Sequence, residues 1–223
     1  MYFKNRQHAA VLLAEKLVQY KGQNPLVLGI PRGAAPMAKI IADALDGEID
    51  VVLVHKLGAP GNPELAVGSV DESGHVYLRE HARALGLSDA DIEAEKKRQM
   101  EMLRERRARY TPVHPPINPA GRIVIVVDNG IATGASMIAA LRSVREKKPK
   151  KLIAAAAVAP YESLQEIRAL ADEVVCLDVP PDFYAVGQFF EEFTQVSDEE
   201  VIALLRQSRP QPMKAKASGE EAA

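Results

Sequence analysis

The feature that most constrains the fold is an alternation between short apolar runs rich in β-branched residues and longer segments with helical periodicity. A strand that is covered on both faces reads as a continuous apolar run, which is typical of parallel sheets. The alternation therefore predicts βαβ units and an α/β fold, with a mostly parallel, doubly wound sheet. The expected strands are 26–30, 51–55, 123–127, 152–158 and 174–177.

Helical periodicity predicts helices between these strands and at both ends of the domain. Their expected ranges are 6–20, 36–45, 136–147, 161–171 and 198–206. With 223 residues and 47% hydrophobic content, the chain can bury one core, so we expect a single domain over residues 1–208. The remaining segment, 209–223, has too little apolar content to fold and is expected to be a disordered tail.

Two segments interrupt the alternation. Residues 57–74 are rich in Gly and Pro, which is typical of a long loop. Residues 88–110 form a charged stretch with a thin apolar stripe of Ile92, Leu103 and Tyr110, which predicts a partly solvated helical insertion. This helix is expected on the surface or at the contact of a homodimer, and the alternative is a basic arm that binds a ligand.

Charge and cysteine content exclude several classes of protein. The chain has 28 basic and 30 acidic residues, so no overall positive field favours binding to nucleic acid or to a membrane surface. Cys176 is the single cysteine, which excludes an internal disulfide framework and fits a reducing cytoplasm. Glu15 and Lys16 break the N-terminal apolar pattern, so this segment is neither a signal sequence nor a membrane span.

The stretch VVDNGIATGAS contains the strongest candidate site. Asp128 falls at the carboxyl end of an expected strand, where open parallel sheets bind ligands. Thr133, Gly134, Ala135 and Ser136 then open a helix, whose first free amides and dipole favour an anion such as a phosphate. The combination predicts a site for a phosphorylated sugar.

Other motifs explain this stretch less well. The Walker pattern requires a lysine where Ala135 stands, and the dinucleotide fingerprint is absent. A purely structural alternative remains, in which Ser136 caps the helix and residues 128–130 form a turn.

The stretch resembles the ribose-5-phosphate loop of the type I phosphoribosyltransferases, which runs apolar strand, two acids, two apolar residues and then Ala-Thr-Gly-x-Ser/Thr. The resemblance implies that Asp128 contacts the ribose hydroxyls of phosphoribosyl pyrophosphate (PRPP), while residues 133–136 hold its 5-phosphate. Asn129 replaces the second acid; its amide can still bond a hydroxyl, but it supplies no charge to the transition state. Ala132 stands where some purine-salvage enzymes carry an aspartate beside the base. This argues against a hypoxanthine/guanine enzyme and leaves an adenine-type enzyme or an uncharacterised branch open.

A second stretch, VLGIPRGAAPMA, resembles the pyrophosphate loop of the same family. Arg32 is expected to contact pyrophosphate oxygens, and the backbone of Gly33 and Ala34 to approach them closely. In that family a mobile lid follows the next strand and closes over the site, and the resemblance implies that residues 57–74 form this lid. Lys56, at the end of the strand that leads into it, is then expected to neutralise pyrophosphate, and its alternative role is a solvated surface lysine. Glu64 in the lid is a candidate for the acceptor or Mg²⁺, and its alternative is an exposed turn residue.

The resemblance implies Mg²⁺ as cofactor, held mainly through PRPP, and no protein metal ligand is assigned. The acceptor is expected beneath a hood at 179–195, where Phe183, Tyr184, Phe189 and Phe190 gather. These rings are candidates for stacking on a flat heterocycle, or they form part of the core. The hood and the GNPE loop are similar to bacterial proteins known only as predicted phosphoribosyltransferases, and this similarity covers residues 3 to about 206.

Two functions follow from these observations. The first is a PRPP-dependent transferase that moves 5-phosphoribose onto a nitrogenous, nucleobase-like acceptor and releases pyrophosphate. The alternative is a non-catalytic module that senses PRPP or a nucleotide on the same fold, which the absence of a second acid at Asn129 favours. A DNA-binding regulator lacks the basic reading helix it would need.

Overall fold

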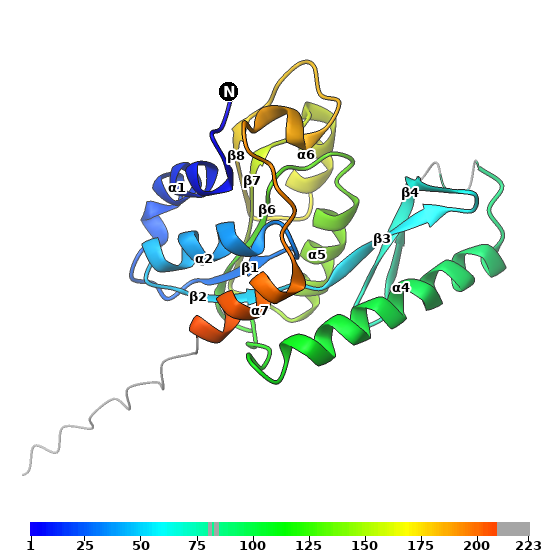
Figure 1. The fold of residues 1–223 in the computed structure, drawn as a ribbon, viewed down its shortest axis with the longest axis horizontal. Coiled ribbons are helices and arrows are strands. Elements are labelled where there is room, and N and C mark those ends of the chain that lie inside the picture. Colours follow the sequence, from blue (N-terminus) through cyan, green and yellow to red (C-terminus); the bar gives the residue numbers. More distant parts are fainter. Residues whose placement is uncertain (80–81, 83–84, 209–223) are drawn as a thin grey trace, which may run out of the picture.

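The computed structural model describes residues 1–79, 82 and 85–208, and its centre is a five-stranded parallel sheet (Figure 1). The strand order is β2-β1-β6-β7-β8, and each neighbouring pair is parallel. The fold is therefore the expected α/β class with a doubly wound sheet. The strands are β1 (Leu26–Gly29), β2 (Glu48–Val51), β6 (Ile123–Asp128), β7 (Lys151–Val158) and β8 (Glu173–Asp178).

Helices cover both faces of this sheet. One face packs against α1 (Arg6–Lys16) and α2 (Ala35–Ala44), and the other packs against α5 (Ala135–Glu146) and α6 (Tyr161–Arg168). Successive residues of a strand point to opposite faces, so Val124 joins one core cluster while Ile125 joins the other. The continuous apolar strands of the sequence are explained by this burial on both sides. A short 3-10 helix, η1 (Val18–Tyr20), follows α1.

The pairing of β1 with β6 brings two strand ends together. In the parallel register, Gly29 lies opposite Val127, and the amide of Ile30 donates to the carbonyl of Val127 at 3.0 Å. Both strands run in the same direction, so the segments that follow them emerge at the same edge of the sheet.

The expected strand at 51–55 was wrong in its boundaries. The apolar run DVVLVHKLG belongs to two strands, since β2 ends at Val51 and β3 (Val54–Ala59) begins a second sheet. Val52 and Leu53 are buried while they cross between the sheets, so hydrophobicity does not mark the break. His55 and Lys56 therefore lie within an antiparallel strand and not at the end of a parallel one.

The second sheet is antiparallel, with the order β3-β4-β5, and includes β4 (Asn62–Asp71) and β5 (Val76–Leu78). It extends to one side of the main sheet together with α4 (Asp89–Tyr110) (Figure 1). A third core cluster joins this sheet to α4 and α7 (Asp198–Gln207), with fully buried Leu57, Leu103 and Leu205. The expected helix at 89–110 is confirmed, and Ser88 begins it with a capping box.

The segment interpreted as a mobile lid forms most of a β-hairpin. Residues 57–74 include the end of β3, a turn at 60–61 and all of β4, and a bulge interrupts the pairing near Gly58. Val67 and Val70 of β4 are buried in the core, which explains why this Gly/Pro-rich segment has regular strand structure. The expected tail at 209–223 and the side chain of Glu64 lie outside the described residues.

The hood segment returns to the start of the chain after β8. It contains the 3-10 helix η2 (Val186–Phe189), and Phe3 pairs with Phe190 in a parallel bridge. The amide of Phe3 donates to the carbonyl of Phe189 at 2.8 Å, and Phe189 and Phe190 are buried. Most of the aromatic cluster is thus part of the core. Within the described residues, no helix is both long and apolar enough to cross a membrane.

We expect truncation at the centre of the main sheet to be strongly destabilising. Ile125 is completely buried in β6, so Ile125→Ala should lower the free energy of unfolding by about 2–5 kcal/mol through lost burial and the cavity it leaves. Val18→Ala, at a residue that is 60% exposed, is the control and should change it by less than about 0.5 kcal/mol. Urea unfolding followed by circular dichroism measures both, and equal effects would contradict the assigned core.

Candidate functional site

A cavity of about 460 Å³ opens at the carboxyl edge of the main sheet. Its wall brings together Asp128 at the end of β6 and the whole loop of residues 130–137 that leads into α5. Lys56 of the small sheet and residues 184–186 of the hood complete the lining. Of the residues predicted from sequence, the cavity therefore collects Asp128, Ala132, Thr133, Gly134, Ala135, Ser136 and Lys56.

The N-terminus of α5 is open for a ligand. Its N-cap is Gly134 in the left-handed conformation, with φ of 81°, and no side chain caps the helix. The first bond within the helix runs from the amide of Ile138 to the carbonyl of Gly134, at 2.8 Å. The amides of Ala135, Ser136 and Met137 precede that bond, and the N-terminus of a helix favours an anion. Because Gly134 is the cap, the structural alternative in which Ser136 caps the helix is excluded.

Asp128 lines this cavity, and its carboxyl is a weaker acid than an ordinary aspartate. Burial raises the pKa of its carboxyl to about 7, and two weaker effects oppose the rise, the hydrogen bond from the Asn129 amide and the positive charge of Arg6. The Asn129 amide donates to Oδ1 at 2.7 Å. A ligand that donates hydroxyl hydrogens would replace the lost hydration and favour the ionised form.

Asn129 lies beside the cavity, between α1 and the loop after β1. Its Oδ1 accepts a hydrogen bond of 2.9 Å from Nε of Arg6. On its other side, Gly33 approaches so closely that a Cβ on Gly33 would lie 2.4 Å from Nδ2 of Asn129. The turn expected to hold pyrophosphate and the strand end expected to hold ribose are therefore in contact.

Arg32 has a different position from the one expected. Its side chain is not part of the cavity lining, and Nη1 lies 4.0 Å from Oδ2 of Asp198 on α7. The amide of Ala34, also expected to approach the ligand, donates to the carbonyl of Ile30 at 3.3 Å. The peptide bond between Pro31 and Arg32 is cis. Gly33 of this turn lies against Asn129, where there is no room for a Cβ.

The small sheet contacts the loop of residues 130–137 through Arg79. Its guanidinium donates to the carbonyl of Thr133 and lies 3.2 Å from the carboxylate of Glu166 on α6. Lys56 of β3 lines the same cavity, so the small sheet contributes a basic side chain to the site from outside the main sheet. Arg79 follows β5, which sequence periodicity did not reveal, so its role was not predicted.

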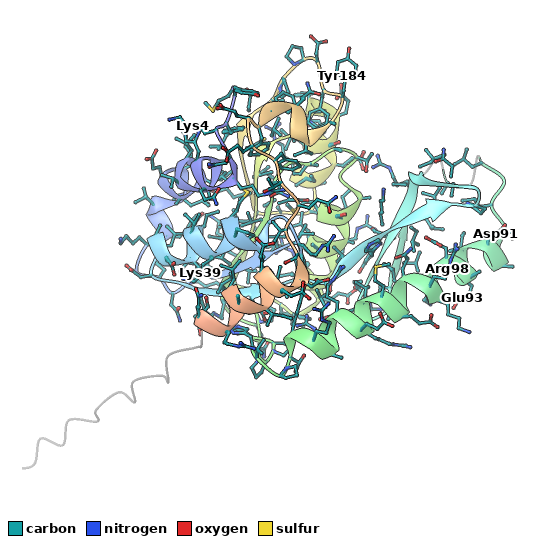
Figure 2. All side chains as sticks on the ribbon, in the orientation of Figure 1. Lys4, Lys39, Asp91, Glu93, Arg98 and Tyr184 are labelled. Carbon is teal, nitrogen blue, oxygen red and sulfur yellow. The ribbon has the colours of Figure 1, made fainter. Side chains whose placement is uncertain are left out.

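The hood contributes one exposed aromatic ring. Tyr184 is 88% exposed and lines the cavity, and Figure 2 shows it at the far end of the hood from α7. Gln188 fixes this loop by accepting hydrogen bonds of 3.0 Å from the amides of Tyr184 and Ala185. Gly130 allows the hood to lie close, because a Cβ there would be 2.6 Å from Cγ1 of Val186.

Arg6 contacts the strand end beside the cavity through Asn129, and sequence patterns did not reveal it. It is only 8% exposed, donates to the carbonyl of Thr194 at 2.6 Å and stacks over Phe193 at 4.0 Å. Burial lowers the pKa of its guanidinium, and the carboxylate of Asp128 opposes this. The available signal was a charged residue at the first position of a helix, which is weak because such residues are usually solvated.

Comparison with known proteins identifies the family. The model of the phosphoribosyl transferase domain matches residues 2–193. The chain belongs to the phosphoribosyl transferase family. This confirms the family that the sequence resembles and agrees with the α/β class of fold inferred from the strand pattern.

Three proteins are similar to this chain over most of its length. Two Mycobacterium tuberculosis proteins, from strains CDC 1551 / Oshkosh and ATCC 25618 / H37Rv, are each named "Putative phosphoribosyl transferase" and are 40% identical over 204 residues. The match covers 91% of this chain and 46% of each relative, so the chain spans about half their length. The crystal structure of TT1426 from Thermus thermophilus has 45% identity and a TM-score of 0.80, and the match covers 94% of this chain and 100% of that one.

The raised pKa of Asp128 predicts how stability depends on pH. Its pKa is about 7 in the folded protein and ordinary, 3.8, in the unfolded chain. Between these values the folded state keeps a proton that the unfolded state has lost, so stability should fall as pH rises from about 4 to 7. Asp128→Asn should remove this part of the pH dependence.

Carbon-detected NMR titration of the aspartate carboxyls measures this pKa directly. Urea midpoints of the wild type and Asp128→Asn between about pH 4.5 and 8 provide the second test. A carboxyl that titrates near its ordinary value, or parallel stability curves for the two proteins, would contradict the assignment.

Proposed function

We propose that this domain transfers a 5-phosphoribosyl group from PRPP to a nitrogenous, nucleobase-like acceptor and releases pyrophosphate. The observation that carries the proposal is the single cavity that joins the open N-terminus of α5, the carboxyl of Asp128 and the exposed ring of Tyr184. These three features match the phosphate, the sugar and the flat acceptor that a phosphoribosyl product contains. The cavity volume is also within the usual range of small-molecule sites.

The residues around the cavity have separate roles in this proposal. The amides of the first turn of α5, with the hydroxyls of Thr133 and Ser136, hold the 5-phosphate. Asp128 accepts hydrogen bonds from the ribose hydroxyls and, when ionised, stabilises positive charge that develops on the sugar ring. The acceptor nitrogen bonds to the anomeric carbon as the bond to pyrophosphate breaks. The leaving group takes the bonding electrons, and the acceptor loses its proton to solvent.

The leaving pyrophosphate requires positive charge and fixed donors, and Lys56 and Arg32 are assigned to it. Lys56 lines the cavity, whereas Arg32 must leave Asp198 to reach the ligand. That movement costs little, since a partly exposed pair at 4.0 Å contributes about 0–1 kcal/mol. Asp198 keeps Arg106, whose Nε lies 3.2 Å away, when Arg32 departs.

The donor set of the cavity fits Mg²⁺ that arrives with the substrate. Asp128 is the carboxylate of the lining, and within the described residues no three His, Cys, Asp or Glu side chains gather as a metal site. Mg²⁺ bound through the phosphates of PRPP would neutralise charge on the pyrophosphate as it leaves. The side chains of Lys56 and Arg32 would add further positive charge next to the pyrophosphate.

Release of pyrophosphate tests the transferase directly. The protein is mixed with PRPP, Mg²⁺ and a panel of purine and pyrimidine bases and other nitrogenous acceptors, and pyrophosphate is measured by a coupled assay. Acceptor-dependent release that Asp128→Asn lowers by about 10²-fold or more supports the proposal. PRPP binding with no release under any acceptor favours the second candidate, a module that senses PRPP, for which the missing acid at Asn129 is the supporting observation.

We also propose that the protein works as a cytoplasmic homodimer. The exposed faces of α4 and the single cysteine are the observations that favour this assignment. Sedimentation velocity of the full chain tests the oligomeric state.

Ser136→Ala should weaken the binding of PRPP and of ribose 5-phosphate by similar factors, about threefold to tenfold, because both ligands carry the 5-phosphate. Ser143→Ala, on the same helix but outside the cavity lining, is the matched control and should bind both normally. Isothermal titration calorimetry measures the four affinities. Unchanged binding of both ligands by Ser136→Ala would remove this residue from the phosphate site.

Arg32→Ala should weaken PRPP binding by about tenfold or more and leave ribose 5-phosphate unchanged, because only PRPP carries a pyrophosphate. Arg109→Ala is the matched control, since Arg109 also pairs with Asp198, at 3.6 Å, and is similarly exposed. The same titrations measure the effect. Equal losses of affinity for the two ligands would contradict a separate pyrophosphate-binding site at this turn.

A further inference from the structure

The orientation of the Asn129 side chain is fixed by a neighbour that can only donate. Nε of Arg6 donates to Oδ1 of Asn129 at 2.9 Å, and a guanidinium has no acceptor. The amide oxygen must therefore face Arg6, and the amide nitrogen must face the opposite way. The amide nitrogen then lies on the side of Gly33.

Arg6 itself has little freedom to move. Its side chain is buried, Nη1 donates to the carbonyl of Thr194 at 2.6 Å, and the guanidinium stacks on Phe193. Both partners belong to the hood, and Asn129 belongs to the strand end, so Arg6 joins these two parts of the site. A buried guanidinium also retains its charge, and the carboxylates of Asp128 and Glu200 both favour this charged form.

The free end of Asn129 is a hydrogen-bond donor. In the described part of the chain, no protein acceptor bonds to Nδ2, which lies next to Gly33 in the turn assigned to pyrophosphate. A donor at this place suits a phosphate oxygen. An aspartate would instead direct one oxygen to Arg6 and the other, negatively charged, toward the pyrophosphate.

We propose that Asn129 donates a hydrogen bond from Nδ2 to the pyrophosphate of PRPP, and that Arg6 is the positioning residue that holds it in this orientation. This inference rests on the proposed function and revises the expectation that the amide of Asn129 serves a ribose hydroxyl. Asn129 then stabilises the leaving group with a hydrogen bond, although it supplies no negative charge next to the ribose.

Three ligands separate this role from the alternatives. Calorimetry of the full chain with Mg²⁺ measures binding of PRPP, inorganic pyrophosphate and ribose 5-phosphate. Asn129→Ala should weaken PRPP and pyrophosphate by about tenfold and change ribose 5-phosphate less than about twofold. Asn129→Asp should weaken the first two ligands further, because a carboxylate replaces the donor and repels the anion. Thermal unfolding of each variant confirms that it is folded.

A double-mutant cycle tests the positioning role of Arg6. Arg6→Lys keeps the charge but loses the planar Nε donor, so pyrophosphate binding should fall several-fold in the wild-type background. In the Asn129→Ala background the same change should have almost no effect, because the group that Arg6 positions is gone. A purely structural role of Arg6 would instead weaken binding by the same factor in both backgrounds, and that result would overturn the positioning role.

The outcomes distinguish the inference from the proposed function. If the wild type binds all three ligands and Asn129→Ala binds them equally well, or loses ribose 5-phosphate as much as pyrophosphate, the inference is wrong and the transferase proposal stands. If the wild type binds neither PRPP nor pyrophosphate, the proposed function fails first and the inference with it.

Discussion

The parallel pairing of β1 with β6 is the interaction on which the site depends. Two adjacent strands of the same direction end at the same edge of the sheet, so the turn at Gly33 touches Asn129 although the residues are far apart in sequence. The buried apolar residues of both strands fix this register, because a shift would place their side chains against the wrong layer of helices. The polar chemistry at the strand ends is thus positioned by hydrophobic packing beneath it.

Sequence patterns predicted the parts of the fold that depend on local periodicity. The strands around Asp128 and the helix that starts beside Ser136 are confirmed, since strand, glycine turn and helix follow each other within a short stretch. The break between Val51 and Val54 was not predictable, because the residues that cross between the two sheets are as apolar as the strands themselves. The hairpin at 57–74 was missed for a related reason. Its glycines and prolines predicted a loop. Its valines are buried by packing against other parts of the chain, which the local sequence does not show.

The same distinction applies to the site. Asp128 and residues 133–136 could be assigned because a carboxylate and an open helix end have recognisable local chemistry. Arg6 could not, since its importance comes from contacts with Asn129 and Thr194 far along the chain. Arg32 shows the opposite limit, because a motif identified its turn but could not indicate that its side chain pairs with Asp198 on the terminal helix.

Gly130 has a consequence for the size of molecules that the domain can accept. The hood lies against the strand end because residue 130 has no side chain to separate Val186 from Val158. Any larger residue at this position would push η2 outward and increase the distance between Tyr184 and Asp128. Under the proposed function, a relative with alanine or serine at this position should admit bulkier rings, so one small residue in the cavity wall sets the dimensions of the acceptor.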